Sequence, residues 1–256
     1  MNLPLLILGR AFRLIVAEPL NTLKVIAPGT VLIALAAYIV LQGFGGDLAA
    51  SQSAPTEINA ALVIVGLVLS LLGWMTFAIF WHRHALLQDE ARHEVMTVTG
   101  RIYWQYFKGA LIVLLLAMLA AFALGFGAFF VTAVFSAASP SILSIVTLGT
   151  TLTINMAISW ILLRNSLVLP AAATGAHLTV SESWAATAPV SRDIFWTAIL
   201  LSVINVLLQQ MMMAVAATQP GLVLPASLVQ IILQSLIFIS VLSTLYGHLV
   251  QHRPLE

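Results

Sequence analysis

Long apolar runs separated by short polar turns dominate the chain. The segments 109–163 and 194–252, of 55 and 59 residues, contain no Asp, Glu, Lys or Arg. A helix rises about 1.5 Å per residue and a bilayer core is about 30 Å thick, so roughly 20 residues span it. Each segment is therefore long enough to cross a membrane twice. Polar turns with prolines, at 136–141 and 218–227, divide the two segments.

A third hairpin precedes these two. Between Lys24 and Arg83 the only charged residues are Asp47 and Glu57, which bracket a polar segment. The pattern therefore predicts an all-α polytopic membrane protein of one domain, residues 1–256, with six transmembrane helices in three hairpins. The predicted spans are about 25–44, 60–81, 109–133, 142–163, 194–216 and 227–246. Barrel strands are disfavoured because the runs are about twice as long as such strands and do not alternate.

Residues 2–18 form an apolar segment of a different kind. Arg10, Arg13 and Glu18 interrupt it, so it is too short and too charged to span. We predict an interfacial helix whose Leu and Ile side chains lie among acyl chains while the two arginines reach headgroup phosphates. Docking of this helix on a soluble partner is the alternative.

Composition and charge placement extend this picture. Of the residues, 61% are hydrophobic and 7% charged, which excludes an ordinary soluble domain. All ten Lys and Arg fall before the first span, after the second, fourth and sixth spans, and none in the three opposite loops. The positive-inside rule then places both termini in the cytoplasm. The six His and most interfacial aromatics, including Trp81, cluster on the same side, as contacts of headgroups and water.

Several kinds of chemistry are disfavoured. The chain has no Cys, which excludes disulfides and thiolate metal sites, and a net charge of +1 gives no reason to expect a nucleic-acid partner. His248 and His252 are four residues apart, and Glu90 and His93 have the spacing of a di-metal motif. A di-metal bundle needs two such pairs and two further Glu, so we predict no metal site and no cofactor.

The predicted spans contain amides in place of charges. No Asp, Glu, Lys, Arg or His lies at mid-membrane, which argues against ion-coupled transport. The candidate amides are Asn155, Asn205, Gln209, Gln210, Gln230 and Gln234. They are open to two interpretations: a polar outer-leaflet pocket for a headgroup or solute, or hydrogen bonds that hold the helices together.

The exits of the second and fourth spans share a pattern. Trp81-His82-Arg83 ends one, and an Arg-x-x-Leu-x-Leu-Pro sequence beginning at Arg164 ends the other, 81 residues further on. Repeated hairpins fit this spacing, and so does chance. With the Ser-Trp-x-x-Thr sequence at 183–187, the exits resemble uncharacterised six-span inner-membrane proteins of alphaproteobacteria. These are distantly similar to the membrane domain that accompanies some glycerophosphodiester phosphodiesterases.

The resemblance implies a membrane module of unknown activity in the bacterial inner membrane. No catalytic residue is implied, because the soluble phosphodiesterase barrel is absent. Arg83 and Arg164, at the membrane edge, are the candidates for contact with phosphate or a lipid headgroup.

The sequence favours a non-enzymatic module that organises membrane lipid or binds another integral membrane protein. A carrier or channel for an uncharged or amphiphilic solute, lined by the amides, is the alternative. An enzyme ranks third because the spans show no nucleophile–base pair.

Overall fold

The computed structural model describes residues 3–45, 58–87, 94–137 and 139–255. Within these residues it is all-α, with six long apolar helices able to span a membrane, which confirms the predicted fold class. Their bounds are α2 Pro19–Gly43, α3 Ala60–Leu86, α4 Gly100–Val134, α5 Pro140–Asn165, α8 Ser191–Thr218 and α9 Val223–Leu249. Consecutive members pack as the hairpins α2–α3, α4–α5 and α8–α9.

The helix boundaries follow from local chemistry. Prolines begin α2 and α5, where a missing N–H costs nothing. The side chain of Asn59 caps α3 by accepting from the Leu62 N–H at 3.2 Å. Most helices extend past the predicted span towards the charged residues, because a helix does not have to end where the hydrocarbon ends.

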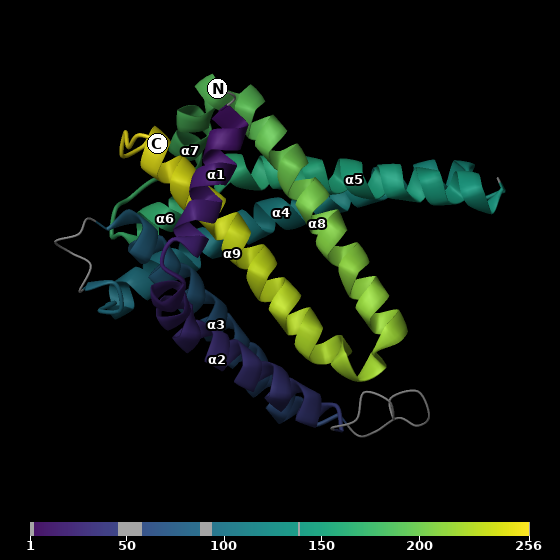
Figure 1. Ribbon diagram of the computed structural model, residues 1–256, viewed down its shortest axis with the longest axis horizontal. Helices are drawn as coiled ribbons and strands as arrows, with labels where there is room; N and C mark the ends of the chain where they lie inside the picture. Colours follow the sequence, from purple (N-terminus) through teal and green to yellow (C-terminus); the bar gives the residue numbers. More distant parts are fainter. Residues whose placement is uncertain (1–2, 46–57, 88–93, 138, 256) are drawn as a thin grey trace.

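Shorter helices and both chain termini gather at one end of the molecule (Figure 1), which we call the basal end. It contains α1 Leu3–Val16, α6 Val168–Ala173 and α7 Val180–Thr187, followed by the 3-10 turn Ala188–Val190. A second 3-10 turn, Pro220–Leu222, joins α8 to α9 at the opposite end. The three hairpins diverge from the basal end (Figure 1).

The first helix packs differently from the sequence prediction. Ile7 and Ala11 of α1 are fully buried in a cluster with residues of α8 and α9 such as Leu242. Part of the apolar face predicted to lie among acyl chains therefore packs on protein. Leu5, Phe12 and Val16 remain exposed and keep an apolar surface for lipid.

Most of the core lies at the basal end, and the far half of the α4–α5 hairpin is exposed. In the most apolar 18-residue stretch of α5, no residue is buried. In the corresponding stretch of α4, only 6% of the residues are buried. By contrast α2 and α3 pack closely: a Cβ added at Gly29 would lie 2.5 Å from the backbone N of Phe77. Small residues thus let these two backbones approach, as in other membrane hairpins.

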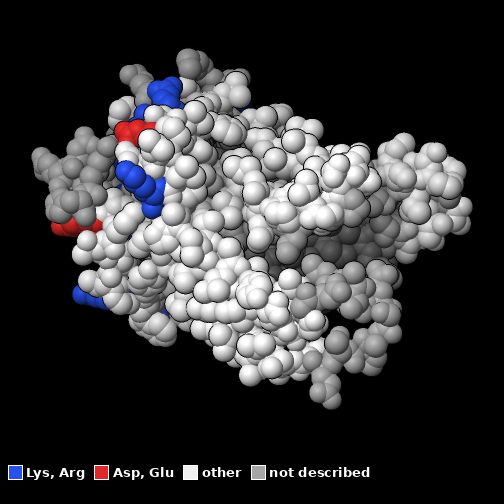
Figure 2. Space-filling model, turned by 60° about the horizontal axis from the view of Figure 1, so that its bottom comes forward, with Lys and Arg blue, Asp and Glu red and all other residues white. Residues whose placement is uncertain are grey.

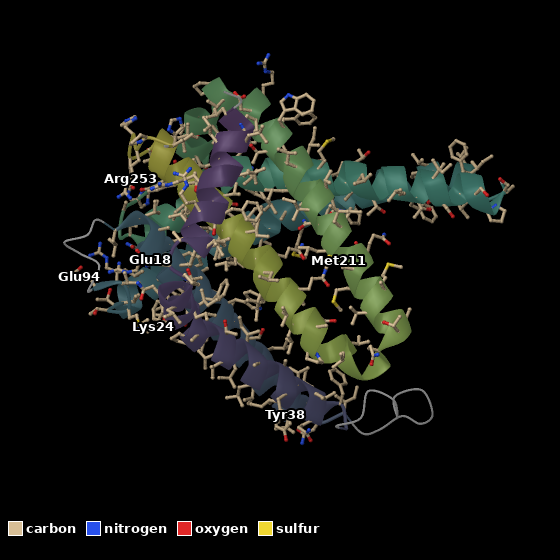
Figure 3. All side chains as sticks on the ribbon, viewed as in Figure 1. Glu18, Lys24, Tyr38, Glu94, Met211 and Arg253 are labelled. Atoms are coloured by element: carbon tan, nitrogen blue, oxygen red, sulfur yellow. The ribbon has the colours of Figure 1, made fainter. Side chains whose placement is uncertain are left out.

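Charged side chains gather at the basal end. On the face that Figure 2 shows, the blue and red atoms of Lys, Arg, Asp and Glu lie at one end, and the other described atoms are white. Glu18, Lys24, Glu94 and Arg253 lie at the basal end in Figure 3, whereas Tyr38 and Met211 lie further along the hairpins. Asp47 and Glu57 lie outside the described residues.

Candidate functional site

A cavity of about 600 Å³ lies between α3, α4, α5, α8 and α9. It forms because these helices pack together near the basal end and then diverge. Asn155, Asn205 and Gln234 line it from α5, α8 and α9. These three residues stand 10, 14 and 15 positions from the basal ends of their helices, or about 15 to 22 Å along the axes. The cavity therefore lies at about the middle of these helices. The position of the polar pocket in the outer leaflet stays a prediction.

The cavity wall is mainly apolar, with a few neutral polar groups. The aromatic residues are Trp74 and Phe77 of α3, Tyr106 of α4 and Phe238 of α9. Ser159 and Ser235 add hydroxyls, and no charged side chain is among the lining residues. Such a surface suits a ligand that is mostly apolar and carries uncharged hydrogen-bonding groups.

The structure brings three of the six candidate amides together at this cavity. Nδ2 of Asn155 donates to the Thr151 carbonyl oxygen of its own helix at 2.9 Å, which leaves its Oδ1 available. Within the described chain, the half-buried side chains of Asn205 and Gln234 make no hydrogen bond to another protein group.

The other three candidate amides lie elsewhere. Gln209 and Gln210 are exposed on α8, and Gln230 is partly buried on α9 outside the cavity wall. Asn205 and Gln209 share a helix face, but only Asn205 lines the cavity.

Arg83 is buried at the last turn of α3, with 5% of its surface exposed. Its guanidinium donates to three backbone carbonyl oxygens: Nη2 to Glu94 at 2.9 Å, Nη1 to Ala173 at 3.1 Å and Nε to Val95 at 3.2 Å. The side chain thus ties α3 to the segment before α4 and to the end of α6. Contact of Arg83 with phosphate stays a prediction, while these internal bonds give the residue a structural role.

Arg164 occupies a similar position at the last turn of α5. Its Nε donates to the Thr187 hydroxyl at 3.2 Å and its Nη2 to the Trp184 carbonyl at 3.1 Å. The guanidinium carbon lies 3.5 Å from the centroid of the Trp184 ring, an arrangement typical of cation–π contact. The Ser183 hydroxyl donates to the Arg164 carbonyl at 2.7 Å. The Ser-Trp-x-x-Thr sequence therefore caps the end of α5, and phosphate contact by Arg164 stays a prediction.

A buried His–Ser pair escaped the sequence analysis. Nδ1 of His82 lies 2.8 Å from the Ser243 hydroxyl, across 161 residues of chain. His82 is fully buried, so its predicted place among headgroups and water is wrong. No sequence signal could have found the pair, because both residues stand in apolar helices and only tertiary packing joins them.

The pair does not have the geometry of an activated nucleophile. The Ser243 hydroxyl donates to the Ile239 carbonyl of its own helix at 2.8 Å, so its oxygen accepts from His82. A general base would have to accept the serine proton instead. Nε2 of His82 is buried and has no partner among the described residues.

Among the described residues, no three His, Asp or Glu side chains come together to hold a metal ion. Glu90 and His93 lie outside those residues.

No known protein family, curated protein or solved structure matches the chain. The family relationship expected from the helix exits therefore stays a prediction, and the function is argued from the cavity.

Proposed function

We propose that this polytopic membrane protein binds an uncharged amphiphile, a membrane lipid or lipid-like solute, in the cavity between α3, α4, α5, α8 and α9. The observation that carries the proposal is the meeting of Asn155, Asn205 and Gln234 on the wall of a mainly apolar space of about 600 Å³. This volume lies within the roughly 300–1,000 Å³ of typical ligand sites.

The wall chemistry selects the class of ligand. Asn205 and Gln234 each offer an amide N–H donor and a carbonyl acceptor, which match hydroxyl, ester or amide groups. A charged headgroup would lose its hydration in this cavity without meeting an opposite charge, at a high free-energy cost. A diacylglycerol, with one hydroxyl and two esters on apolar chains, has the required chemistry. A protein that organises lipid and a carrier of an amphiphilic solute would both have to bind such a molecule.

Replacing Gln234 by Leu tests this site. The change keeps the side-chain size but leaves a ligand group unpaired in the cavity, which costs about 1–3 kcal/mol. We expect photo-crosslinking of the purified protein by a photoactivatable diacylglycerol in phosphatidylcholine nanodiscs to require about tenfold more probe. The crosslinked peptides of the wild type should come from α5, α8 and α9.

Gln210→Leu is the matched control, because Gln210 is exposed on α8 outside the cavity. It should crosslink as the wild type does, and the thermal unfolding of both variants should match that of the wild type. Equal crosslinking of wild type and Gln234→Leu, or crosslinked peptides from the outer faces of α4 and α5 only, would refute the proposal.

A second candidate function, binding to another integral membrane protein, is favoured by the exposed apolar surface of the α4–α5 hairpin. Phe122, Phe126, Phe129 and Phe130 are each at least half exposed there. Purification of the wild type and of Gln234→Leu in mild detergent distinguishes the two functions. A stoichiometric membrane protein that stays bound in mild detergent, and whose retention Gln234→Leu does not change, would favour this partner-binding role over the cavity.

We propose that the protein lies in a bacterial inner membrane with the basal end on the cytoplasmic side. The support for this orientation is that every Lys and Arg lies on that side of the spans. The chain has no native Cys, so single cysteines report the sidedness directly. A membrane-impermeant maleimide added to intact cells should label Ser136→Cys, in the α4–α5 turn, and leave Thr97→Cys unlabelled until the cells are opened. The reverse pattern would overturn the assignment.

A further inference from the structure

A second cavity lies at the basal end, between α4, α6 and the segment that joins α6 to α7. Its volume of about 440 Å³ falls within the roughly 300–1,000 Å³ of typical ligand sites. The two cavities have no lining residue in common. This second cavity is therefore a separate place where a molecule could bind.

One face of α4 forms a wall that changes from polar to apolar. Gln105, Lys108 and Ile112 line the cavity at spacings of three and four residues, which places them on the same side of the helix. Lys108 directly precedes the predicted span 109–133, and Ile112 lies inside that span, about 6 Å further along the axis. The ammonium group thus comes from the membrane edge and the aliphatic side chain from the hydrocarbon side.

The opposite wall is mostly aliphatic. Val168 and Ala172 of α6 contribute one face of that helix, and Leu178 and Val180 add apolar groups from the segment before α7 and its first residue. A Cβ added at Gly109 would lie 3.6 Å from the Val168 side chain, so α4 packs on α6 here at ordinary contact distance. The cavity therefore has a closed apolar side beside its polar groups.

The polar groups are those that an anionic headgroup needs. Nζ of Lys108 lies 6.0 Å from the centroid of the Trp104 ring, and within the described chain it has no carboxylate partner. His177 is exposed at the cavity and interacts electrostatically with Glu182 of α7, so its charge is already partly balanced. The Glu182 carboxylate accepts from the N–H and hydroxyl of Thr179, and it does not line the cavity. Lys108 is therefore the charge that a ligand meets, with Gln105 and His177 as hydrogen-bonding groups.

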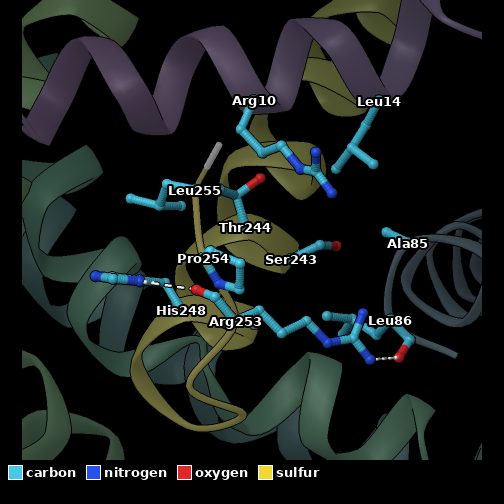
Figure 4. A pocket seen from close by; sticks show the side chains of 11 residues that line it. Arg10, Leu14, Ala85, Leu86, Ser243, Thr244, His248, Arg253, Pro254 and Leu255 are labelled. Atoms are coloured by element: carbon cyan, nitrogen blue, oxygen red, sulfur yellow. Dashed lines mark hydrogen bonds between the residues drawn. The ribbon is translucent and has the colours of Figure 1, made fainter. Parts of the chain in front are cut away.

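Another pocket at the basal end, shown in Figure 4, differs in size. It lies between α1, α3, α9 and the C-terminal tail, and its volume is about 30 Å³. A single water molecule requires roughly 10–15 Å³ on the same measure, so this pocket has no room for a lipid headgroup. Arg253 in its wall donates to the Leu86 carbonyl oxygen (Figure 4). The cavity beside Lys108 is the larger of the two and has an apolar wall as well.

We propose that the cavity between α4 and α6 binds an anionic glycerophospholipid, with the phosphate at Lys108 and the start of an acyl chain along Ile112 and Val168. A free phosphate ester would leave the aliphatic wall uncovered, and a hydrocarbon would leave the ammonium unused. Phosphatidylglycerol carries one negative charge and no cation, whereas the trimethylammonium of phosphatidylcholine is repelled by Lys108. The ligand differs from the uncharged amphiphile of the central cavity, so the two sites can be tested separately.

The chain supplies a matched pair of lysines for the test. Its lysines are Lys24 and Lys108, each exposed and each directly before a predicted span, but only Lys108 lines the cavity. Lys108→Gln and Lys24→Gln therefore remove the same charge at the same kind of position. Native mass spectrometry measures the lipid retained by the full chain after release from nanodiscs of equal phosphatidylglycerol and phosphatidylcholine.

We expect the wild type to retain phosphatidylglycerol preferentially. Lys108→Gln should weaken this binding by about tenfold, and Lys24→Gln should change it by less than about twofold. Ala176→Trp fills the cavity without changing a charge and should also release the lipid, which keeps the test valid if Lys108→Gln does not fold. Gln234→Leu should retain phosphatidylglycerol as the wild type does, because Gln234 lines only the central cavity.

Three outcomes would overturn the site. The first is a wild type that retains both lipids equally. The second is equal weakening by Lys108→Gln and Lys24→Gln, which would mean that the lysines attract anionic lipid only as general surface charge. The third is displacement of the bound lipid by glycerol 3-phosphate as readily as by short-chain phosphatidylglycerol, which would assign the cavity to a free phosphate ester.

Discussion

Replacing Arg83 by Met is expected to lower the free energy of unfolding by about 3 kcal/mol or more. Methionine fills most of the same volume but donates no hydrogen bonds, so the carbonyl oxygens of Glu94, Val95 and Ala173 lose their partner. Each buried acceptor left unpaired costs about 1–3 kcal/mol. Arg83 ties two segments to α3: the segment before α4 and the end of α6. Both would lose this connection to α3 in the variant.

The measurement is unfolding of the detergent-purified protein, followed by circular dichroism or tryptophan fluorescence. Arg101→Met is the control, because Arg101 is exposed in the first turn of α4 and its loss should change stability by less than about 0.5 kcal/mol. Arg83→Lys should recover only a minor part of the loss, since one ammonium cannot reach three diverging carbonyls. Equal, small effects of Arg83→Met and Arg101→Met would show that water reaches these carbonyls and that Arg83 is free for a phosphate.

The helices and their pairing could be predicted from the sequence because the bilayer sets strict limits on length. A backbone in hydrocarbon must satisfy its own hydrogen bonds, so the 55 uncharged residues 109–163 have one solution, two helices and a turn. Pro140, at the start of α5, marks that turn both in the sequence and in the structure. The position of each long helix along the chain was therefore predictable.

The sequence could not predict which side of each helix faces the protein interior. That orientation determines which residues form the candidate sites. In a soluble helix, the polar face marks the outside. Lipid-facing and protein-facing sides of a span are both apolar, so this signal is lost. Asn205 and Gln210 look equivalent in the sequence, yet one lines the central cavity and the other is exposed. The uncharged Ser243, similarly, gives no sign that it faces His82 of another hairpin.

The three hairpins share a feature that the sequence only suggested. Each has, at or just after the basal end of its second helix, an arginine that donates to a backbone carbonyl. Arg83 follows this pattern in α3, Arg164 in α5 and Arg253 after α9. These contacts bind a separate segment to each helix end, where carbonyls without intrahelical partners gather and positive charge is favoured. A common plan for the three hairpins stays a prediction, for which the 81-residue spacing of Arg83 and Arg164 is the observation in the sequence.

Trp81→Ala is expected to lower the free energy of unfolding by about 3–5 kcal/mol. The variant tests whether Trp81 faces the protein core or the membrane interface. The sequence grouped Trp81 with the aromatics of the membrane interface, but its side chain is fully buried against the core of α3, α4 and α9. Trp196, at a similar depth in α8, is 53% exposed, so Trp196→Ala should cost less than about 0.5 kcal/mol in the same unfolding experiment.

Trp81→Phe separates packing from hydrogen bonding at this position. Nε1 of Trp81 is buried and has no partner among the described residues, so phenylalanine gives up no hydrogen bond and removes a desolvated donor. Most of the stability lost in Trp81→Ala should therefore return, because the ring fills most of the cavity. If Trp81→Ala and Trp196→Ala proved equally mild, Trp81 would be an interfacial anchor as the sequence suggested, and the tight packing at the basal end would be wrong.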